Sequence, residues 1–163
     1  MSRQLITDIA IHEIGTMESP AGSNIQKYGE WFGLNGQEWC GIFCSWVYDH
    51  AGLPLGPLDF TRGFASVPFM FQHAKKLNLI TQNPKPGDLV IYDWKKGDPG
   101  HVMGDWTPEH VGIFLQWIDK SAGTFYTIEG NTSAGSQSNG GQVQKRQRNM
   151  AFVQAFINPK NLE

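Results

Sequence analysis

The stretch Gly36-Gln37-Glu38-Trp39-Cys40-Gly41 leads from a loop directly into an apolar repeat. From Cys40 onward, apolar side chains recur at positions 40, 43, 44, 47 and 51, which is one face of a helix with 3.6 residues per turn. Gly52 suits the left-handed position just beyond the end of such a helix. The sequence therefore predicts a helix from about Trp39 to Ala51, with Cys40 in its first turn.

Helical periodicity also appears on either side of this stretch. Apolar residues between Leu5 and Ile14 recur at helical spacing, with Ser2 as a cap and Gly15 as a stop. Asn24 is the expected cap of a short helix that carries Lys27 and Tyr28. A further helix is predicted over residues 66–78, with Pro68 in its first turn.

The second half of the chain has the pattern of short strands. Five turn-bounded segments are predicted strands, at residues 88–93, 110–117, 124–129, 142–146 and 152–156. Alternation of Val111, Ile113, Leu115 and Trp117 predicts one buried strand face, and Asn139-Gly140-Gly141 predicts a hairpin turn. Helices followed by such strands indicate an α+β domain, with the helices packed on an antiparallel sheet of about five to six strands.

Length and charge narrow the function classes. The 163 residues fit a single domain over 1–161, and we interpret Leu162-Glu163 as a candidate cloning scar. A net charge of −2 without a basic face argues against nucleic-acid binding. Lys145, Arg146 and Arg148 are expected at a solvated strand end, the alternative being a polyanion patch. No apolar run reaches the roughly 20 residues of a spanning helix, so membrane insertion is not expected.

Cys40 is the first candidate for chemistry. Unpaired N–H groups and the helix dipole favour an anion at a helix start, and a thiol there forms its thiolate more readily. Cys44, one turn later, is expected to be a core residue. Position alone leaves Cys40 open between a nucleophile and a second core residue.

Candidate partners for a thiol nucleophile lie in the second half. His110 begins a predicted strand, where a general base could stand. Glu129 and Asn131, at i and i+2 on an extended chain, would project from one face about 6.6 Å apart. His101 is the rival base, but apolar alternation does not follow it. A zinc site made by Cys40, Cys44 and two histidines is the chemical alternative, disfavoured because no second closely spaced histidine pair exists.

Four motifs in order resemble the CHAP family, the cysteine, histidine-dependent amidohydrolases/peptidases. They are Trp39-Cys40-Gly41-Ile42-Phe43, Pro86-Gly87-Asp88-Leu89-Val90, Glu109-His110-Val111-Gly112-Ile113 and Ile128-Glu129-Gly130-Asn131-Thr132. Outside them, residues 18–24 and 130–141 resemble the CHAP domains of actinobacterial phage lysins. The resemblance covers most of the chain and implies a papain-like fold related to the NlpC-type hydrolases.

The resemblance also implies a role for each site residue. Cys40 would attack a carbonyl, His110 would move the proton, Glu129 would orient the imidazole, and Asn131 would be a fourth polar member. The oxyanion would be held by the Cys40 backbone N–H together with one side chain, for which the candidates are Tyr28 and Gln37. Trp39 and Trp106 are candidates to line the substrate groove. No metal and no cofactor is expected.

The function expected from the resemblance is hydrolysis of amide bonds in bacterial peptidoglycan, by an endolysin-like endopeptidase or an N-acetylmuramoyl-L-alanine amidase. The alternatives are a CHAP amidase acting on a soluble peptide or polyamine conjugate, and a non-catalytic wall-binding module that uses its tryptophans. We expect a monomer. The first residues lack the apolar core of a signal peptide, so a cytoplasmic protein is expected, reaching the wall by holin-type release or as part of a virion.

Overall fold

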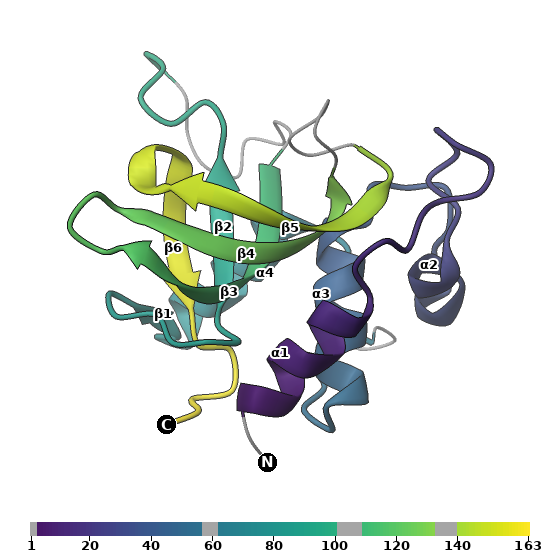
Figure 1. The fold of residues 1–163 in the computed structure, drawn as a ribbon, viewed down its shortest axis with the longest axis horizontal. Coiled ribbons are helices and arrows are strands. Elements are labelled where there is room, and N and C mark those ends of the chain that lie inside the picture. The colour runs from purple at the N-terminus through teal and green to yellow at the C-terminus, as the bar shows by residue number, and fades with distance from the viewer. Residues whose placement is uncertain (1–2, 57–61, 101–108, 133–139) are drawn as a thin grey trace.

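The computed structural model describes residues 3–56, 62–100, 109–132 and 140–163, and in them helices precede an antiparallel sheet (Figure 1). The helices are α1 (Arg3–His12), α2 (Lys27–Phe32), α3 (Cys40–His50) and α4 (Val67–Lys76). The strands are β1 (Ile80–Thr81), β2 (Leu89–Asp93), β3 (Glu109–Asp119), β4 (Thr124–Thr132), β5 (Gln142–Asn149) and β6 (Val153–Ile157). They form one six-stranded sheet in the order β1-β6-β2-β3-β4-β5, which confirms the predicted α+β class.

The helix boundaries follow from local capping. Helix α3 ends before Gly52, which adopts a positive φ of 76°, as its sequence predicted. Helix α4 is capped by Ser66, whose hydroxyl accepts a hydrogen bond from the Phe69 N–H. The predicted cap of α2 was wrong: Gln26, not Asn24, accepts the Gly29 N–H. Asn24 itself has a φ of 57° and lies in the preceding loop.

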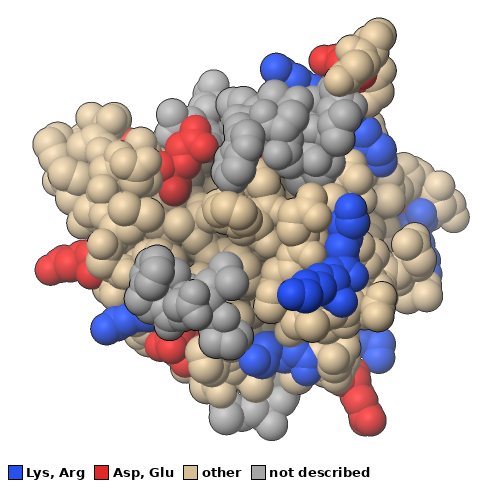
Figure 2. All heavy atoms as spheres, turned by 180° about the vertical axis from the view of Figure 1, so that it is seen from behind, with Lys and Arg blue, Asp and Glu red and all other residues tan. Residues whose placement is uncertain are grey.

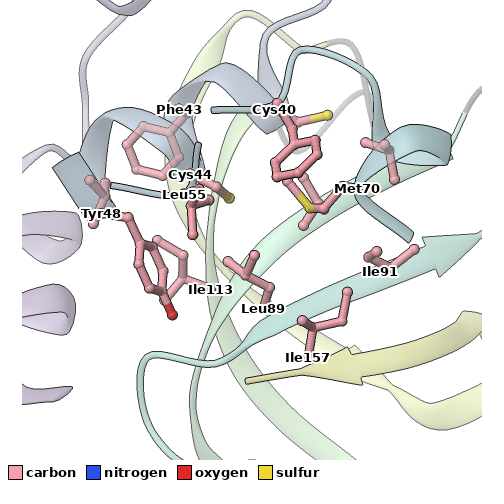
Figure 3. Packing of buried hydrophobic residues seen from close by; sticks show 14 of the residues in the cluster. Cys40, Phe43, Cys44, Tyr48, Leu55, Met70, Leu89, Ile91, Ile113 and Ile157 are labelled. Carbon is pink, nitrogen blue, oxygen red and sulfur yellow. The ribbon is translucent and has the colours of Figure 1, made fainter. Parts of the chain in front are cut away.

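One face of the sheet is covered by helices, and α3 packs centrally on it (Figure 3). Phe43, Cys44 and Val47 of α3 are fully buried against strand residues such as Ile113 and Ile128. Gly130 of β4 permits this close packing, because a Cβ there would lie 2.7 Å from the Phe43 Cβ. The helix that carries Cys40 is thereby held firmly against β3 and β4.

The opposite face is concave and aromatic. Phe125 of β4 and Phe156 of β6 have ring centroids 5.7 Å apart, although β2 and β3 lie between their strands. Three strand spacings in a flat sheet would span about 14 Å, so the sheet curls strongly around these rings. Phe114 lies between them, 5.7 Å from Phe125 and 5.9 Å from Phe156.

A register shift in β3 changes which face Trp117 occupies. The pairing with β4 slips between Phe114 and Gln116, so one extra residue is accommodated there. Trp117 consequently packs on Phe114 in the concave cluster, with ring centroids 5.4 Å apart. The predicted face that joined Val111, Ile113, Leu115 and Trp117 was therefore wrong at Trp117, whereas Leu115 still packs on the cluster of Val111 and Ile113.

The Pro86-Gly87-Asp88 turn fastens the N-terminal helices to the sheet. Asp88 accepts hydrogen bonds from the Lys85 N–H at 2.8 Å and from Arg3 at 2.6 Å. The Tyr48 hydroxyl of α3 donates to the Gly87 carbonyl at 2.5 Å. The role of this motif is therefore structural, and its carboxylate is committed to Arg3.

The last residues pack on the fold as well. The Leu162 N–H donates to Asn158 Oδ1 at 2.9 Å, and Arg3 donates to the Leu162 carbonyl at 2.7 Å. The interpretation of Leu162-Glu163 as a cloning scar stays a prediction. In the part of the chain that the structure describes, no helix has both the length and the apolar character needed to cross a bilayer.

Candidate active site

Cys40 is the first residue of α3 and is 4% exposed, at the margin of the packed cluster (Figure 3). Trp39 precedes it without a side-chain cap, so the first-turn N–H groups are not satisfied by the cap residue. Gly41 allows the chain at Phe64 to approach this turn, because a Cβ at position 41 would lie 2.7 Å from the Phe64 carbonyl oxygen. The thiol therefore stands at the positive end of a helix, as the sequence predicted.

Cys44 differs from Cys40 in its surroundings. It is fully buried among apolar side chains, and its thiol belongs to the core (Figure 3). Burial raises the pKa of Cys44 well above its ordinary value, and the charges of Cys40 and Glu129 act in the same direction. Of the two cysteines, Cys44 is the one held as a neutral packing residue.

His110 and Glu129 meet across two neighbouring strands. Nε2 of His110, on β3, lies 2.8 Å from Oε1 of Glu129, on β4, and both side chains have no exposed surface. Gly112 makes the approach feasible, because a Cβ there would lie 2.6 Å from Glu129 Cγ. Because the third residue of the His110-Val111-Gly112 motif has no side chain, the Glu129 side chain can reach His110.

Glu129 is surrounded by donors. Its Oε2 accepts from the Thr127 hydroxyl at 2.6 Å and from Arg148 Nε at 2.9 Å, and its Oε1 accepts from Arg148 Nη2 at 2.5 Å. Burial alone would raise the pKa of Glu129, but the bonds from Arg148 and the charge and hydrogen bond of His110 hold it well below its ordinary value. The carboxylate is therefore ionised and can only accept hydrogen bonds.

Arg148, like Thr127, is a residue around Glu129 that the sequence did not point to. Its guanidinium donates two hydrogen bonds to the carboxylate of Glu129, and its side chain is 8% exposed. The prediction that Arg148 lies at a solvated strand end was therefore wrong. The guanidinium also lies over the rings of Tyr92 and Trp94, at 5.3 and 5.1 Å from their centroids. The available signal in the sequence was that Arg146 and Arg148 alternate along a predicted strand. Once this strand pairs with β4, Arg148 lies on the same face of the sheet as Glu129.

The imidazole of His110 binds the carboxylate of Glu129 and lies within electrostatic reach of Cys40. Burial lowers the pKa of His110, but the charges of Glu129 and Cys40 and the hydrogen bond to Glu129 raise it to about 9. An ionised Glu129 requires a proton on Nε2, and Nδ1, which makes no hydrogen bond among the described residues, is the nitrogen left to accept a thiol proton. Tyr92 and Trp94 fix the ring plane, stacking on it at centroid distances of 5.9 and 6.0 Å.

This electrostatic arrangement predicts an unusual titration. We expect the His110 ring to titrate near pH 9 in the intact protein, measured by NMR of its ring protons. Glu129→Gln should lower that pKa, because it removes the charge that offsets burial. Since the folded-state pKa exceeds the unfolded value of about 6.5, the stabilisation is complete below pH 6.5 and is lost as pH rises through 9. A wild-type titration midpoint below 7 would contradict this assignment.

Asn131 is fully buried near the end of β4 and has a φ of 56°. The pairing of β4 with β5 shifts between Glu129 and Thr132, so the regular i, i+2 geometry assumed for Glu129 and Asn131 does not hold. Asn131 remains close in sequence to the carboxylate, but the structure does not align the two on a regular strand face. Its role as a fourth polar member stays a prediction.

The two candidates for the oxyanion side chain occupy different environments. Tyr28 is fully buried, and its hydroxyl donates to Glu13 Oε2 at 3.1 Å. Burial and the Glu13 charge raise the pKa of Tyr28 above its ordinary value, against a hydrogen bond with Thr16. Gln37 is exposed in the loop before Cys40. The structure therefore directs the Tyr28 hydroxyl to Glu13 and leaves Gln37 accessible.

The two tryptophans predicted to line a groove have different outcomes. Trp39 has no exposed surface, stacks on Tyr28 with ring centroids 5.6 Å apart and donates to Glu18 at 3.2 Å. It is therefore a core residue, and its predicted place on a groove surface was wrong. Trp106 lies outside the described residues, as does the rival base His101.

The described residues thus pair a buried imidazole with an ionised carboxylate and place a thiol at a helix start whose charge acts on that imidazole. These are the three kinds of group that thiol-dependent acyl transfer uses. Among the same residues, no group of three or more His, Cys, Asp or Glu side chains is placed to hold a metal ion. The chemistry that such an arrangement can perform is attack of sulfur on a carbonyl, with the proton passing through His110.

Comparison with known proteins agrees with this class of site. The chain belongs to the CHAP domain family, whose sequence profile matches residues 32–131. The fold is similar to the crystal structure of a wild-type endolysin, LysIME-EF1, with a TM-score of 0.54 and 14% sequence identity. The alignment covers 98% of this chain, which spans 65% of that endolysin chain. No curated protein sequence is significantly similar to this one.

Proposed function

We propose that this protein is a peptidoglycan hydrolase that cleaves amide bonds of bacterial cell-wall peptides with Cys40 as its nucleophile. The observation that carries the proposal is the buried pair of His110 and Glu129, in which Nε2 of His110 lies 2.8 Å from the carboxylate, together with the place of Cys40 at the start of α3. The charges of Glu129 and Cys40 outweigh burial and raise the pKa of His110 to about 9. An imidazole with a raised pKa can accept the proton of a thiol, which forms the thiolate–imidazolium pair that attacks a carbonyl.

The proposed reaction has two acyl-transfer steps. The Cys40 sulfur attacks the peptide carbonyl, and the imidazolium of His110 gives its proton to the leaving amine. Water then hydrolyses the thioester: His110 takes the water proton, the acyl group leaves as a carboxylic acid, and the Cys40 sulfur departs as a thiolate beside the imidazolium. Glu129 keeps the imidazole in the required tautomer throughout.

The negative oxygen formed in each step needs donors. The Cys40 backbone N–H at the start of α3 supplies one. For the second we favour Gln37, because it is exposed three residues before the nucleophile, whereas the Tyr28 hydroxyl is bound to Glu13 in the core. Asn131 is retained as a polar neighbour of the site.

The substrate class rests on the family and on the similarity of fold to a protein described as an endolysin. In the same proposal, the protein acts on the wall after holin-type release or from a virion. On the face in Figure 2, Lys and Arg side chains lie mostly right of centre in separate groups, Asp and Glu side chains lie mainly toward the margins, and uncharged surface separates them. Among the described residues on that face, they do not form the continuous basic band typical of a nucleic-acid-binding surface.

Mass spectrometry of digested peptidoglycan tests this proposal most directly. We expect fragments with new amine and carboxyl ends, released either between muramic acid and L-alanine or within the peptides. The first product set would identify an amidase and the second an endopeptidase. New reducing sugar ends without new amines, or hydrolysis restricted to soluble peptide or polyamine amides, would contradict the proposal.

The proposed reaction needs no metal ion, because a thiolate is the nucleophile. Treatment with EDTA should leave the rate of wall lysis within about twofold of the untreated rate, a change of only about 0.4 kcal/mol in the barrier. The rate is followed by turbidity clearing, with calcium added back as a control. Loss of lysis that calcium alone restores would show that an ion holds the site together.

A further inference from the structure

A pocket of about 460 Å³ lies beside the proposed catalytic residues and has no part in the reaction described above. Its walls include Tyr92 and Trp94 at the end of β2, Phe152 before β6, and Arg146 and Arg148 on β5. Curling of the sheet brings these three segments together, although β3 and β4 separate β2 from β5 in the strand order. The pocket therefore belongs to the concave side of the sheet.

Trp94 connects this pocket to the reacting centre. The indole of Trp94 stacks on the imidazole of His110, with ring centroids 6.0 Å apart and an interplanar angle of 28°. Phe152 meets the indole edge-on at 5.6 Å. A group bound in the pocket against the face or edge of Trp94 would consequently be separated from the general base His110 by the indole ring alone.

The charged wall of the pocket is basic. Arg146 and Arg148 are two residues apart on β5 and pair with Thr127 and Phe125 of β4, so their side chains share the concave face. Arg148 is committed to Glu129 through Nε and Nη2. Burial and the neighbouring charge of Arg148 lower the pKa of Arg146, so an added anion would relieve the repulsion between them. No carboxylate residue lines the pocket within the described part of the chain.

We propose that this pocket is a substrate subsite that binds a free carboxylate of the wall peptide through the guanidinium of Arg146, against the rings of Trp94 and Phe152. A planar guanidinium matches a carboxylate with two parallel hydrogen bonds, and apolar walls strengthen that interaction by excluding water. Stem peptides of peptidoglycan carry free carboxylates, whereas an amidated peptide offers a neutral group at the same place. This inference rests on the proposed function, because it concerns the substrate of the same site.

The test compares two soluble muropeptides that differ only in a terminal carboxylate or carboxamide. Binding is measured by isothermal titration calorimetry to the full chain carrying Cys40→Ala, so that neither ligand is consumed. We expect the carboxylate form to bind about tenfold more tightly. Adding Arg146→Gln should abolish the preference for the carboxylate. Arg146→Lys should retain part of it, because the positive charge remains while the two parallel hydrogen bonds of the guanidinium are lost.

Lys145→Gln is the matched control, since Lys145 is exposed and adjacent in sequence but lies over the Tyr126 ring, away from the pocket lining. It should keep the full preference. A preference unchanged by Arg146→Gln, or no measurable binding of either muropeptide, would overturn the subsite. Wall hydrolysis by protein with intact Cys40 is assayed in parallel: if hydrolysis occurs without the preference, only the subsite fails, and if hydrolysis is absent, the proposed function fails.

Discussion

Cys40→Ala is expected to slow wall hydrolysis by about 10⁴-fold or more while the protein stays folded. The substitution removes the sulfur that forms the acyl-enzyme, and no hydroxyl or second thiol replaces it. The side chain is small and lies at the margin of the core, so circular dichroism should remain native-like. Turbidity clearing of purified walls measures the loss. The pKa of His110 should also fall, because the charge of Cys40 contributes to raising it.

Cys44→Ala is the control for this experiment. It removes a buried thiol of the same kind one helical turn away, so it should cost packing stability but leave hydrolysis within a few-fold of the wild-type rate. Iodoacetamide should correspondingly label Cys40 and inactivate the enzyme with a single modification. Equal losses in the two variants, or a label found mainly on Cys44, would show that the wrong cysteine has been assigned.

Arg148→Met is expected to lower the free energy of unfolding by about 3–5 kcal/mol, the cost of leaving a buried charge without its partner. The substitution keeps much of the apolar stem but takes both guanidinium bonds from Glu129, which has no exposed surface. Urea denaturation followed by circular dichroism measures the change. The pKa of Glu129 should rise, because the bonds and charge of Arg148 help to hold it down.

A double-variant cycle separates this ion pair from simple packing. Lys145→Met, on the exposed neighbour, should change stability by less than about 1 kcal/mol. Glu129→Gln combined with Arg148→Met should be less destabilising than the sum of the two single substitutions, because the second removes the charge that the first leaves unpaired. Additive effects would mean that the guanidinium and carboxylate do not depend on each other.

The elements with a strong local signal could be predicted from the sequence. The apolar repeat after Trp39 gave the position of α3 to within a residue at each end, because the period, the loop before it and Gly52 all agree. The main strands were located by their alternation, although β3, β4 and β5 extend further than expected. Strand β1, Ile80–Thr81, was missed because two residues carry no periodicity and pair with β6 only through tertiary structure.

The features that escaped prediction depend on contacts between distant segments. A run of Lys145 and two arginines has the composition of a solvated strand end, and only the pairing of β5 with β4 shows that Arg148 faces Glu129. Trp117 lies on the concave face instead of the predicted helix-covered face because of a register shift between β3 and β4, and no residue type in the sequence indicates this shift. Tyr28 was assigned to the site from the family resemblance and Trp39 as a candidate groove residue, yet their polar atoms bind the buried Glu13 and Glu18.

The stack of Trp94 on His110 also makes the proton of the site observable by optical spectroscopy. A protonated imidazole in contact with an excited indole quenches its emission by accepting an electron, whereas the neutral ring does so far less. Because the two ring centroids are 6.0 Å apart, the fluorescence intensity of Trp94 should be lower when His110 is protonated than when it is neutral. Subtracting the emission of a Trp94→Phe variant isolates this signal from the other tryptophans. The indole is thus an intrinsic reporter, placed by the fold, with which the protonation of His110 can be followed in real time and without a label.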